Sequence, residues 1–186
     1  MSNWFETRAG TWNAVWECLA DGVASADAPA RFLGLASVDG AGGAALRTVR
    51  LRHANRAAAQ LTVYTDSASA KVAELRANPL ASLCVWDAPR NFQIRLRVKT
   101  TISTGADVAH LWPEMTADAQ RAYGGTPAPG TPIKDPRDHA RTPRPERLAV
   151  LTFDILEVDT VSLDEPVHRR ILFKASDGFE GDWRAP

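Results

Sequence analysis

The stretch from Arg47 to Lys71 carries residues whose types and spacing suit the binding of an anion. The run Tyr64-Thr65-Asp66-Ser67-Ala68-Ser69-Ala70-Lys71 is rich in hydroxyls and small residues and ends in a cation at the start of a predicted helix. Hydroxyls, free amides at a helix start and a lysine together favour a phosphate group. Arg47 and Arg52, in the segment before, could add charge-assisted hydrogen bonds. These residues therefore predict a phosphate site.

The same residues also allow a structural interpretation. A strand with alternating arginines, as in Arg47 to Arg52, is often a solvated sheet face. A serine just before a helix often serves only as its cap. The residue chemistry alone leaves both interpretations open.

Alternation of apolar and polar residues predicts the strands that position this stretch. The predicted strands are 31–38, 44–52, 61–65, 80–87, 91–103, 147–158 and 167–176. Most are joined by short turns, which favours an antiparallel barrel over a parallel sheet. The glycine-rich turn 39–43 leads into another strand and not into a helix, so it is not a dinucleotide-binding loop.

Three helical regions and one long loop complete the prediction. Residues 11–20 have an apolar face typical of a packed amphipathic helix, with Thr11 as the predicted cap. A second helix is expected over 71–79, where Pro79 ends it. Residues 105–123 are expected to form two short helices or a kinked one, because Pro113 interrupts them. The proline-rich loop 124–146 is expected to be mobile, or else to lie near a substrate.

Composition limits the classes of function. The 186 residues contain 22 Lys plus Arg and 22 Asp plus Glu, and this balance argues against a general nucleic-acid or membrane-surface binder. Cys18 and Cys84 have no metal-ligand spacing, and we interpret them as free thiols. The N-terminus lacks a signal-peptide pattern and no stretch has the roughly 20 apolar residues of a membrane span. The expectation is a soluble cytoplasmic protein with a single domain.

The ordered motifs resemble the flavin-binding signature of the pyridoxamine 5'-phosphate oxidase family. The resemblance starts with Arg47-Thr48-Val49-Arg50-Leu51-Arg52, continues through Tyr64-Thr65 to Ser69 and Lys71, and includes Asn78-Pro79, Gln93, His168-Arg169-Arg170 and the final Trp183-Arg184-Ala185-Pro186. It covers about residues 30–186. It implies a mainly β fold, an FMN-binding split β-barrel with a few flanking helices. The whole chain, 1–186, is then one domain in which 1–28 form an N-terminal helix and linker.

The resemblance also implies roles for individual residues. The implied cofactor-binding residues are Arg47, Thr48, Val49, Arg50, Leu51, Arg52, Tyr64, Thr65, Ser69, Lys71, Gln93 and Arg170. His168 and Arg170 are implied as catalytic, with Arg170 beside the flavin ring and His168 on the substrate. The family further implies a homodimer in which Arg47 and Lys71 of one chain share an FMN with Arg170 of the other. The resemblance implies no metal site.

Departures from the family pattern concern mainly the substrate side. Pro166 stands where the true oxidase has an arginine, Ala70 where it has a second phosphate-binding cation, and Arg52 where it has a lysine. By ungapped counting, Thr160 stands where it has a tryptophan beside the flavin. We therefore predict an FMN-dependent oxidoreductase of unestablished substrate, with weak or absent oxidation of pyridoxamine 5'-phosphate. The alternatives are a non-catalytic flavin- or haem-binding module on the same barrel and a barrel without a cofactor.

Overall fold

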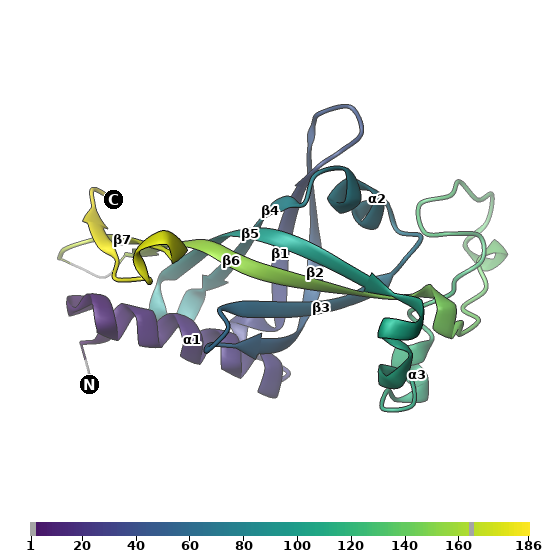
Figure 1. Cartoon of the computed structure of the whole chain (residues 1–186), viewed down its shortest axis with the longest axis horizontal. Coiled ribbons are helices and arrows are strands. Elements are labelled where there is room, and N and C mark those ends of the chain that lie inside the picture. The colour runs from purple at the N-terminus through teal and green to yellow at the C-terminus, as the bar shows by residue number, and fades with distance from the viewer. Residues whose placement is uncertain (1–2, 164–165) are drawn as a thin grey trace.

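The computed structural model describes residues 3–163 and 166–186, and its centre is one antiparallel sheet (Figure 1). The strands are β1 (Phe32–Val38), β2 (Ala44–Asn55), β3 (Gln60–Asp66), β4 (Leu80–Asp87), β5 (Phe92–Thr104), β6 (Leu148–Ser162), β7 (Arg169–Lys174) and β8 (Asp182–Arg184). The α-helices among the described residues are α1 (Arg8–Ala24), α2 (Ala70–Ala77) and α3 (Ala117–Gln120). All seven predicted strands are present, and β8 is the addition.

The sheet closes into a six-stranded barrel. Its strand order is β3-β2-β1-β4-β5-β6-β7-β8, and a further pairing of β3 with β6 joins the two ends of the first six strands. Strands β7 and β8 continue from β6 beyond the closure, on the left in Figure 1. This architecture confirms the predicted split β-barrel.

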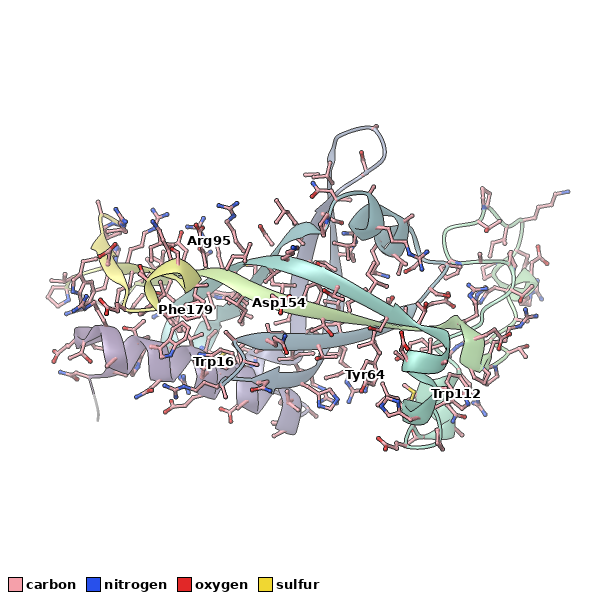
Figure 2. The ribbon with its side chains drawn as sticks, in the orientation of Figure 1. Trp16, Tyr64, Arg95, Trp112, Asp154 and Phe179 are labelled. Atoms are coloured by element: carbon pink, nitrogen blue, oxygen red, sulfur yellow. The ribbon has the colours of Figure 1, made fainter. Side chains whose placement is uncertain are left out.

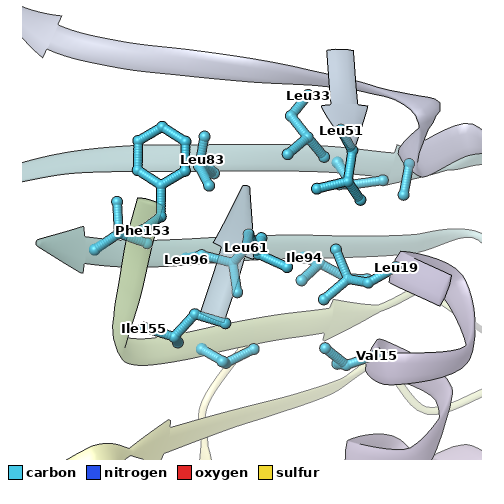
Figure 3. Packing of buried hydrophobic residues seen from close by; sticks show 14 of the residues in the cluster. Val15, Leu19, Leu33, Leu51, Leu61, Leu83, Ile94, Leu96, Phe153 and Ile155 are labelled. Carbon is cyan, nitrogen blue, oxygen red and sulfur yellow. The ribbon is translucent and has the colours of Figure 1, made fainter. Parts of the chain in front are cut away.

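The barrel interior is filled by the apolar side chains that project from one face of each strand. Leu33, Leu51, Leu83, Leu96 and Phe153 are fully buried there (Figure 3). The intervening residues face outward, so the alternation of the sequence matches the two faces of the sheet. Burial of this apolar set is the main favourable contribution to folding.

Strand β6 contains a β-bulge. Odd-numbered residues point into the barrel before the bulge, and even-numbered residues point into it afterwards. Opposite β5, Val98 pairs with Ile155 and Arg97 with Glu157, so Leu156 is the extra residue. Before the bulge the odd-numbered residues are buried, and after Glu157 the even-numbered residues from Val158 onward are buried. The bulge also marks the change of neighbour on the other edge of β6, from β3 to β7.

Helix α1 packs along the barrel wall, as its predicted apolar face requires. Val15 and Leu19 enter the core, and Trp12 stacks on Phe179 near the C-terminus with ring centroids 4.8 Å apart. The helix is longer than predicted, and the predicted cap Thr11 is wrong. Thr7 is the cap, because its hydroxyl accepts a hydrogen bond from the Gly10 amide at 2.9 Å.

The segment between β5 and β6 packs outside the barrel, around a second small apolar cluster. Its buried members are Val108, Tyr123, Leu148 and Val150. Only residues 117–120 of the predicted helical region form an α-helix, while 105–107 and 109–111 are 3₁₀ turns and the remainder is irregular. No helix in the described part of the chain is long and apolar enough to cross a membrane.

Candidate functional site

The turn after β3 is anchored by a buried carboxylate. Asp66 accepts hydrogen bonds from the Arg147 guanidinium at 2.6 and 2.9 Å, from the Ala68 amide at 2.8 Å and from the Gly124 amide at 2.8 Å. The carboxylate thereby ties the turn to the start of β6 and to the loop that follows Tyr123. This network gives the backbone of the turn a defined shape.

Lys71, Thr65 and Ser69 meet at this turn, as the sequence predicted. Lys71 Nζ donates to Thr65 Oγ1 at 3.1 Å, and the Thr65 and Ser69 hydroxyl oxygens are 3.4 Å apart. Ser69 is the N-cap residue of α2, but its hydroxyl donates to the Asp66 carbonyl at 2.7 Å and makes no capping bond. The structural interpretation of this serine as a side-chain cap is therefore wrong.

Lys71 is a half-buried cation without a carboxylate partner in the described residues. Burial, followed by repulsion from Arg47, lowers the pKa of its ammonium, while Asp66 and Glu74 act in the opposite direction. A bound anion would relieve both unfavourable effects. Lys71 with the two hydroxyls is thus a donor set that fits a phosphate.

Arg47 lies beside the same turn, but its charge is already paired. Its Nη2 is 2.6 Å from Glu74 Oε2, and its Nη1 donates to the Ser37 hydroxyl and to the Ala45 carbonyl, the latter at 2.9 Å. Glu74 also accepts from the Ser37 hydroxyl at 2.6 Å. Arg47 is therefore held rigidly at the turn, and Glu74 offsets part of its attraction for an anion.

The rest of the β2 signature divides between the two faces of the strand. Val49 and Leu51 are buried in the barrel core, so only their backbone atoms are available to a ligand. Thr48, Arg50 and Arg52 alternate with them on the outer face. Of these five residues, Thr48, Arg50 and Arg52 can present side chains to a ligand, and Val49 and Leu51 can present only backbone atoms.

Arg50 and Arg52 border a cavity of about 420 Å³ on the outer side of the barrel. Tyr64, from β3, shares this lining, and its ring lies 5.5 Å below the Arg52 guanidinium carbon. Burial, followed by repulsion from Arg52, lowers the pKa of Arg50. The cavity therefore combines positive charge with an aromatic surface.

Gln93 and Arg170 lie on a different part of the molecule. Both are opposite Val161, Gln93 from β5 and Arg170 from β7, so they share the outer face of the sheet. Arg170 donates to the Asp159 carboxylate at 2.8 and 3.0 Å, and this hydrogen-bonded pair raises the pKa of Arg170. His168 is exposed just before β7.

These residues are far from the turn after β3 within one chain. Asp66 pairs with Leu148 at one end of β6, and Arg170 pairs with Val161, thirteen residues further along. At about 3.3 Å per residue the separation along the strand is roughly 40 Å. One chain therefore does not bring Lys71 and Arg170 to the same ligand.

Sequence reasoning missed the acidic residues that organise both regions. Asp66 was part of the quoted motif, but its buried position was not predicted. Glu74 lies one helical turn after Lys71, and this spacing puts both residues on one helix face. The spacing could therefore have indicated that Glu74 is close to the turn. Asp159 had no local signal, because its partners Arg95 and Arg170 come from two other strands. Thr160, counted to the position of a flavin-side tryptophan, is buried in the barrel and donates to the Ile171 carbonyl.

The comparisons with known proteins agree with this fold. The structure of a pyridoxamine 5'-phosphate oxidase-related, FMN binding protein from Nostoc punctiforme PCC 73102 matches with a TM-score of 0.74 and 25% identity, covering 100% of this chain and 99% of that one. PhzG from Burkholderia lata 383, solved in complex with tetrahydrophenazine-1-carboxylic acid, matches with a TM-score of 0.74 and 17% identity over 95% of this chain and 91% of its own. A general stress protein 26-related protein from Clostridium acetobutylicum matches with a TM-score of 0.58 and 12% identity, covering 89% and 95%. A comparison with curated protein sequences gives no match.

A family model covers the part of the chain that holds the turn and both faces of β2. Residues 12–104 match the model described as pyridoxamine 5'-phosphate oxidase, FMN-binding domain. The match includes Arg47, Lys71 and Gln93, whose arrangement was described above. The chain therefore belongs to the pyridoxamine 5'-phosphate oxidase family and carries its FMN-binding domain.

Proposed function

We propose that the protein is a homodimeric, FMN-dependent oxidoreductase acting on a small molecule. FMN, when bound, supplies the two-electron redox chemistry. The residues of the chain hold its phosphate, orient its ring and select the substrate. Pyridoxamine 5'-phosphate is a poor candidate substrate, because Pro166 cannot donate the hydrogen bonds of the arginine found at that position in the true oxidase.

The observation that carries the proposal is the half-buried ammonium of Lys71, which lies beside two hydroxyls and has no carboxylate within ion-pair distance in the described residues. A cation in this position is unfavourable in the free protein, since burial removes hydration and lowers its pKa. A phosphate group bound to Lys71, Thr65 and Ser69 would restore the lost interactions. Arg47, fixed by Ser37 and Glu74, would contribute a further donor at the rim.

The homodimer is supported by an apolar area on the outer face of the sheet. Large apolar side chains of β1, β2 and β4 project there, with exposed fractions from 40% to 75%: Phe32, Val38, Leu46, Leu80 and Trp86. Exposed apolar residues gathered on one face indicate an interaction surface. A second copy is the occupant that also explains the roughly 40 Å between Lys71 and Arg170, because a two-fold interface can place Arg170 of one chain at the flavin of the other.

A non-catalytic flavin-binding module is the second candidate. Asp159 pairs with Arg170 and also with Arg95, so the charge of Arg170 is partly neutralised. A neutralised arginine stabilises a negatively charged reduced flavin less than a free one does. Anaerobic reduction of the FMN-loaded protein with a substrate panel distinguishes the candidates: an enzyme loses its oxidised-flavin absorbance with some substrate and recovers it with an acceptor.

Calorimetric titration with FMN and riboflavin tests the phosphate assignment. The two ligands share the ring and differ in the phosphate, so only FMN should depend on Lys71. A charge-assisted contact contributes about 1.5–3 kcal/mol, so Lys71→Ala should lower the affinity for FMN about 10- to 150-fold. Riboflavin should bind both forms equally.

Arg76→Ala is the matched control, because Arg76 is an exposed cation on the same helix with no ion pair in the described residues. It should leave both affinities unchanged within about twofold. Equal losses for FMN and riboflavin in Lys71→Ala would mean that Lys71 supports the fold, and the phosphate assignment would have to be withdrawn.

A further inference from the structure

The proline-rich loop between α3 and β6 has two ends that lie side by side. Thr126 and Ala140 exchange backbone hydrogen bonds of 2.8 and 2.9 Å, and the Arg144 amide donates to the Tyr123 carbonyl at 3.0 Å. These bonds close the loop at its base, as in a compact surface loop whose ends meet. We call the paired ends the neck of the loop: residues 123–126 and 140–147.

The neck is tightly packed, whereas the body of the loop is open to solvent. Gly124 has a φ of +109°, and a Cβ there would lie 2.5 Å from the Thr142 carbonyl oxygen. Gly124 and Gly125 are buried, while most residues from 127 to 139 are exposed. Figure 2 shows the loop at the right of the molecule, with its side chains projecting away from the barrel. The contacts of the neck therefore determine how easily the loop opens.

Both ends of the neck are fastened to the turn after β3 through one carboxylate. Asp66 Oδ2 accepts from the Gly124 amide at 2.8 Å, and Asp66 Oδ1 accepts from the Arg147 guanidinium at 2.6 and 2.9 Å. The Ser67 amide also donates to the Arg147 carbonyl at 2.8 Å. Asp66 is buried, so opening the neck would deprive a buried carboxylate of its partners. The turn cannot keep its shape when the neck opens.

A phosphate at this turn would be sensitive to the same contacts. The proposed donors Thr65, Ser69 and Lys71 lie on both sides of Asp66 in the sequence, and the Ser69 hydroxyl donates to the Asp66 carbonyl at 2.7 Å. Their arrangement therefore depends on how Asp66 is held. A ligand that binds only the closed form stabilises that form by mass action. The reverse effect has the same size, because coupling between two sites is reciprocal.

We propose that a phosphate bound at the turn after β3 holds the loop 124–146 closed, and that Asp66 carries this coupling to the neck. The proposal rests on the proposed function, because it describes the regulation of the same FMN site. Riboflavin shares the flavin ring and lacks the phosphate, so it should leave the neck as it is in the free protein. Loosening the neck should in turn lower the affinity for FMN and leave that for riboflavin unchanged.

Hydrogen exchange of the full chain, followed by NMR, measures the opening of the neck. The amides of Gly124, Ala140 and Arg144 are the probes, because each donates a hydrogen bond there. Saturation with FMN should slow their exchange about fivefold or more, and saturation with riboflavin should not slow it. The Ala59 amide, which donates to the Arg56 carbonyl in a different turn, is the internal control. Equal slowing by both ligands, or equal slowing of Ala59 by FMN, would overturn the proposal.

Gly124→Ala tests the reciprocal effect, because its Cβ would force the neck apart. The affinity for FMN, measured by calorimetry, should fall about fivefold or more, and that for riboflavin should stay within about twofold. Gly130→Ala is the matched control. Gly130 also has a positive φ, +87°, but a Cβ there meets nothing within 4 Å, so the substitution strains the loop away from the neck and should change neither affinity.

Ala140→Pro keeps the proposal testable even where Gly124→Ala does not fold. It removes the amide that donates to the Thr126 carbonyl at 2.8 Å, and Ala140 is exposed. It should also lower the affinity for FMN and not that for riboflavin, and unchanged FMN binding with faster exchange at the neck would overturn the proposal. FMN binding that depends on Lys71 without any slowing of exchange would count against the coupling alone. FMN binding that does not depend on Lys71 would instead count against the phosphate assignment.

Discussion

The turn after β3 and the outer face near β7 each contain a cation of the flavin-binding signature, but they differ in how its charge is compensated. At the turn, Lys71 is half-buried, and among residues 3–163 and 166–186 its hydrogen-bond partner is the Thr65 hydroxyl. Near β7, Arg170 is bonded twice to Asp159. Within the described residues, the charge of Lys71 is therefore not balanced by a hydrogen-bonded carboxylate, whereas the charge of Arg170 is balanced by Asp159.

This difference shows what a sequence signature does and does not determine. The signature identified both regions equally well, since it depends on residue types. In the described residues, the donors of the first region have no anionic partner at Lys71, whereas Arg170 in the second is hydrogen-bonded to Asp159. The second can contribute to a flavin site only if a partner chain brings a flavin to it, which makes assembly part of the hypothesis.

The largest expected effect comes from removing the buried carboxylate that shapes the turn. Asp66→Ala leaves the mostly buried Arg147 without its partner and frees the Gly124 amide. Breaking a buried pair in this way costs about 3–5 kcal/mol of the free energy of unfolding. Urea denaturation measures the loss.

The double variant Asp66→Ala/Arg147→Met is the control, because it removes both charges together. It should be more stable than Asp66→Ala alone. A loss below about 1 kcal/mol in the single variant would show that this pair behaves like a surface ion pair and does not anchor the turn.

Mixing two defective variants tests whether the two regions meet across chains. Lys71→Ala and Arg170→Met dimers should each retain little FMN after desalting. In mixed dimers one site carries both substitutions and the other carries neither. Unfolding and refolding an equimolar mixture should thus restore about a quarter of the sites.

Leu46→Glu provides the control for this exchange. Leu46 is the most exposed of the apolar residues on the outer sheet face, at 75%, so a charge there should prevent dimer formation without disturbing the core. When both variants also carry Leu46→Glu, mixing should restore no flavin binding. No restoration by the pair without Leu46→Glu, with dimers verified by light scattering, would show that Lys71 and Arg170 do not share a flavin across chains.

A smaller effect is expected at the carboxylate that competes for Arg47. Glu74→Gln removes a negative charge next to the proposed phosphate, while Ser37 and the Ala45 carbonyl still hold the arginine. FMN should therefore bind about three- to tenfold more tightly, and riboflavin should not change. Weaker FMN binding, measured by calorimetry, would mean that Glu74 is needed to position Arg47.

The smallest effect is the alkaline pH dependence set by Lys71. Its pKa in the folded protein is below the ordinary value of 10.5, mainly through burial. As the pH rises through that lowered pKa, the ammonium is lost and FMN should bind up to about tenfold less tightly, whereas riboflavin should not. The unfolded chain holds this proton more tightly, so the same pH rise should stabilise the flavin-free protein up to pH 10.5. Lys71→Ala should abolish both trends, and their persistence in that variant would assign them to another group.

Local patterns were sufficient to predict the barrel strands and the contents of the turn. Alternation located β1 to β5, and the hydroxyl-rich run predicted a turn in which Lys71 lies beside Thr65 at the start of a helix. These features depend on residues that are close together in the sequence, so one sequence is enough to predict them. The apolar face of α1 was predicted for the same reason.

Interactions between distant segments could not be predicted. The Asp66–Arg147 pair joins residues 81 apart, and Asp159 meets two arginines from different strands. The cap of α1 was misplaced because a threonine occurs both at position 7 and at position 11, and the helix begins one turn earlier, where Thr7 accepts from the Gly10 amide. The 105–123 region forms two 3₁₀ turns and the short α3, and its apolar residues pack in the second apolar cluster.

The bulge at Leu156 has a consequence for changes in chain length. From Thr152 onward the strand alternates on either side of the bulge, with Ile155 inward before it and Val158 inward after it. Deleting Leu156 would leave every remaining residue of β6 on its present face. Deleting a residue further along would turn Asp159 and the residues beyond it to the opposite face unless the bulge moved to compensate. Length variation in this strand among natural relatives is therefore expected between Ile155 and Val158, where an insertion or deletion does not exchange the inside of the barrel with its outside.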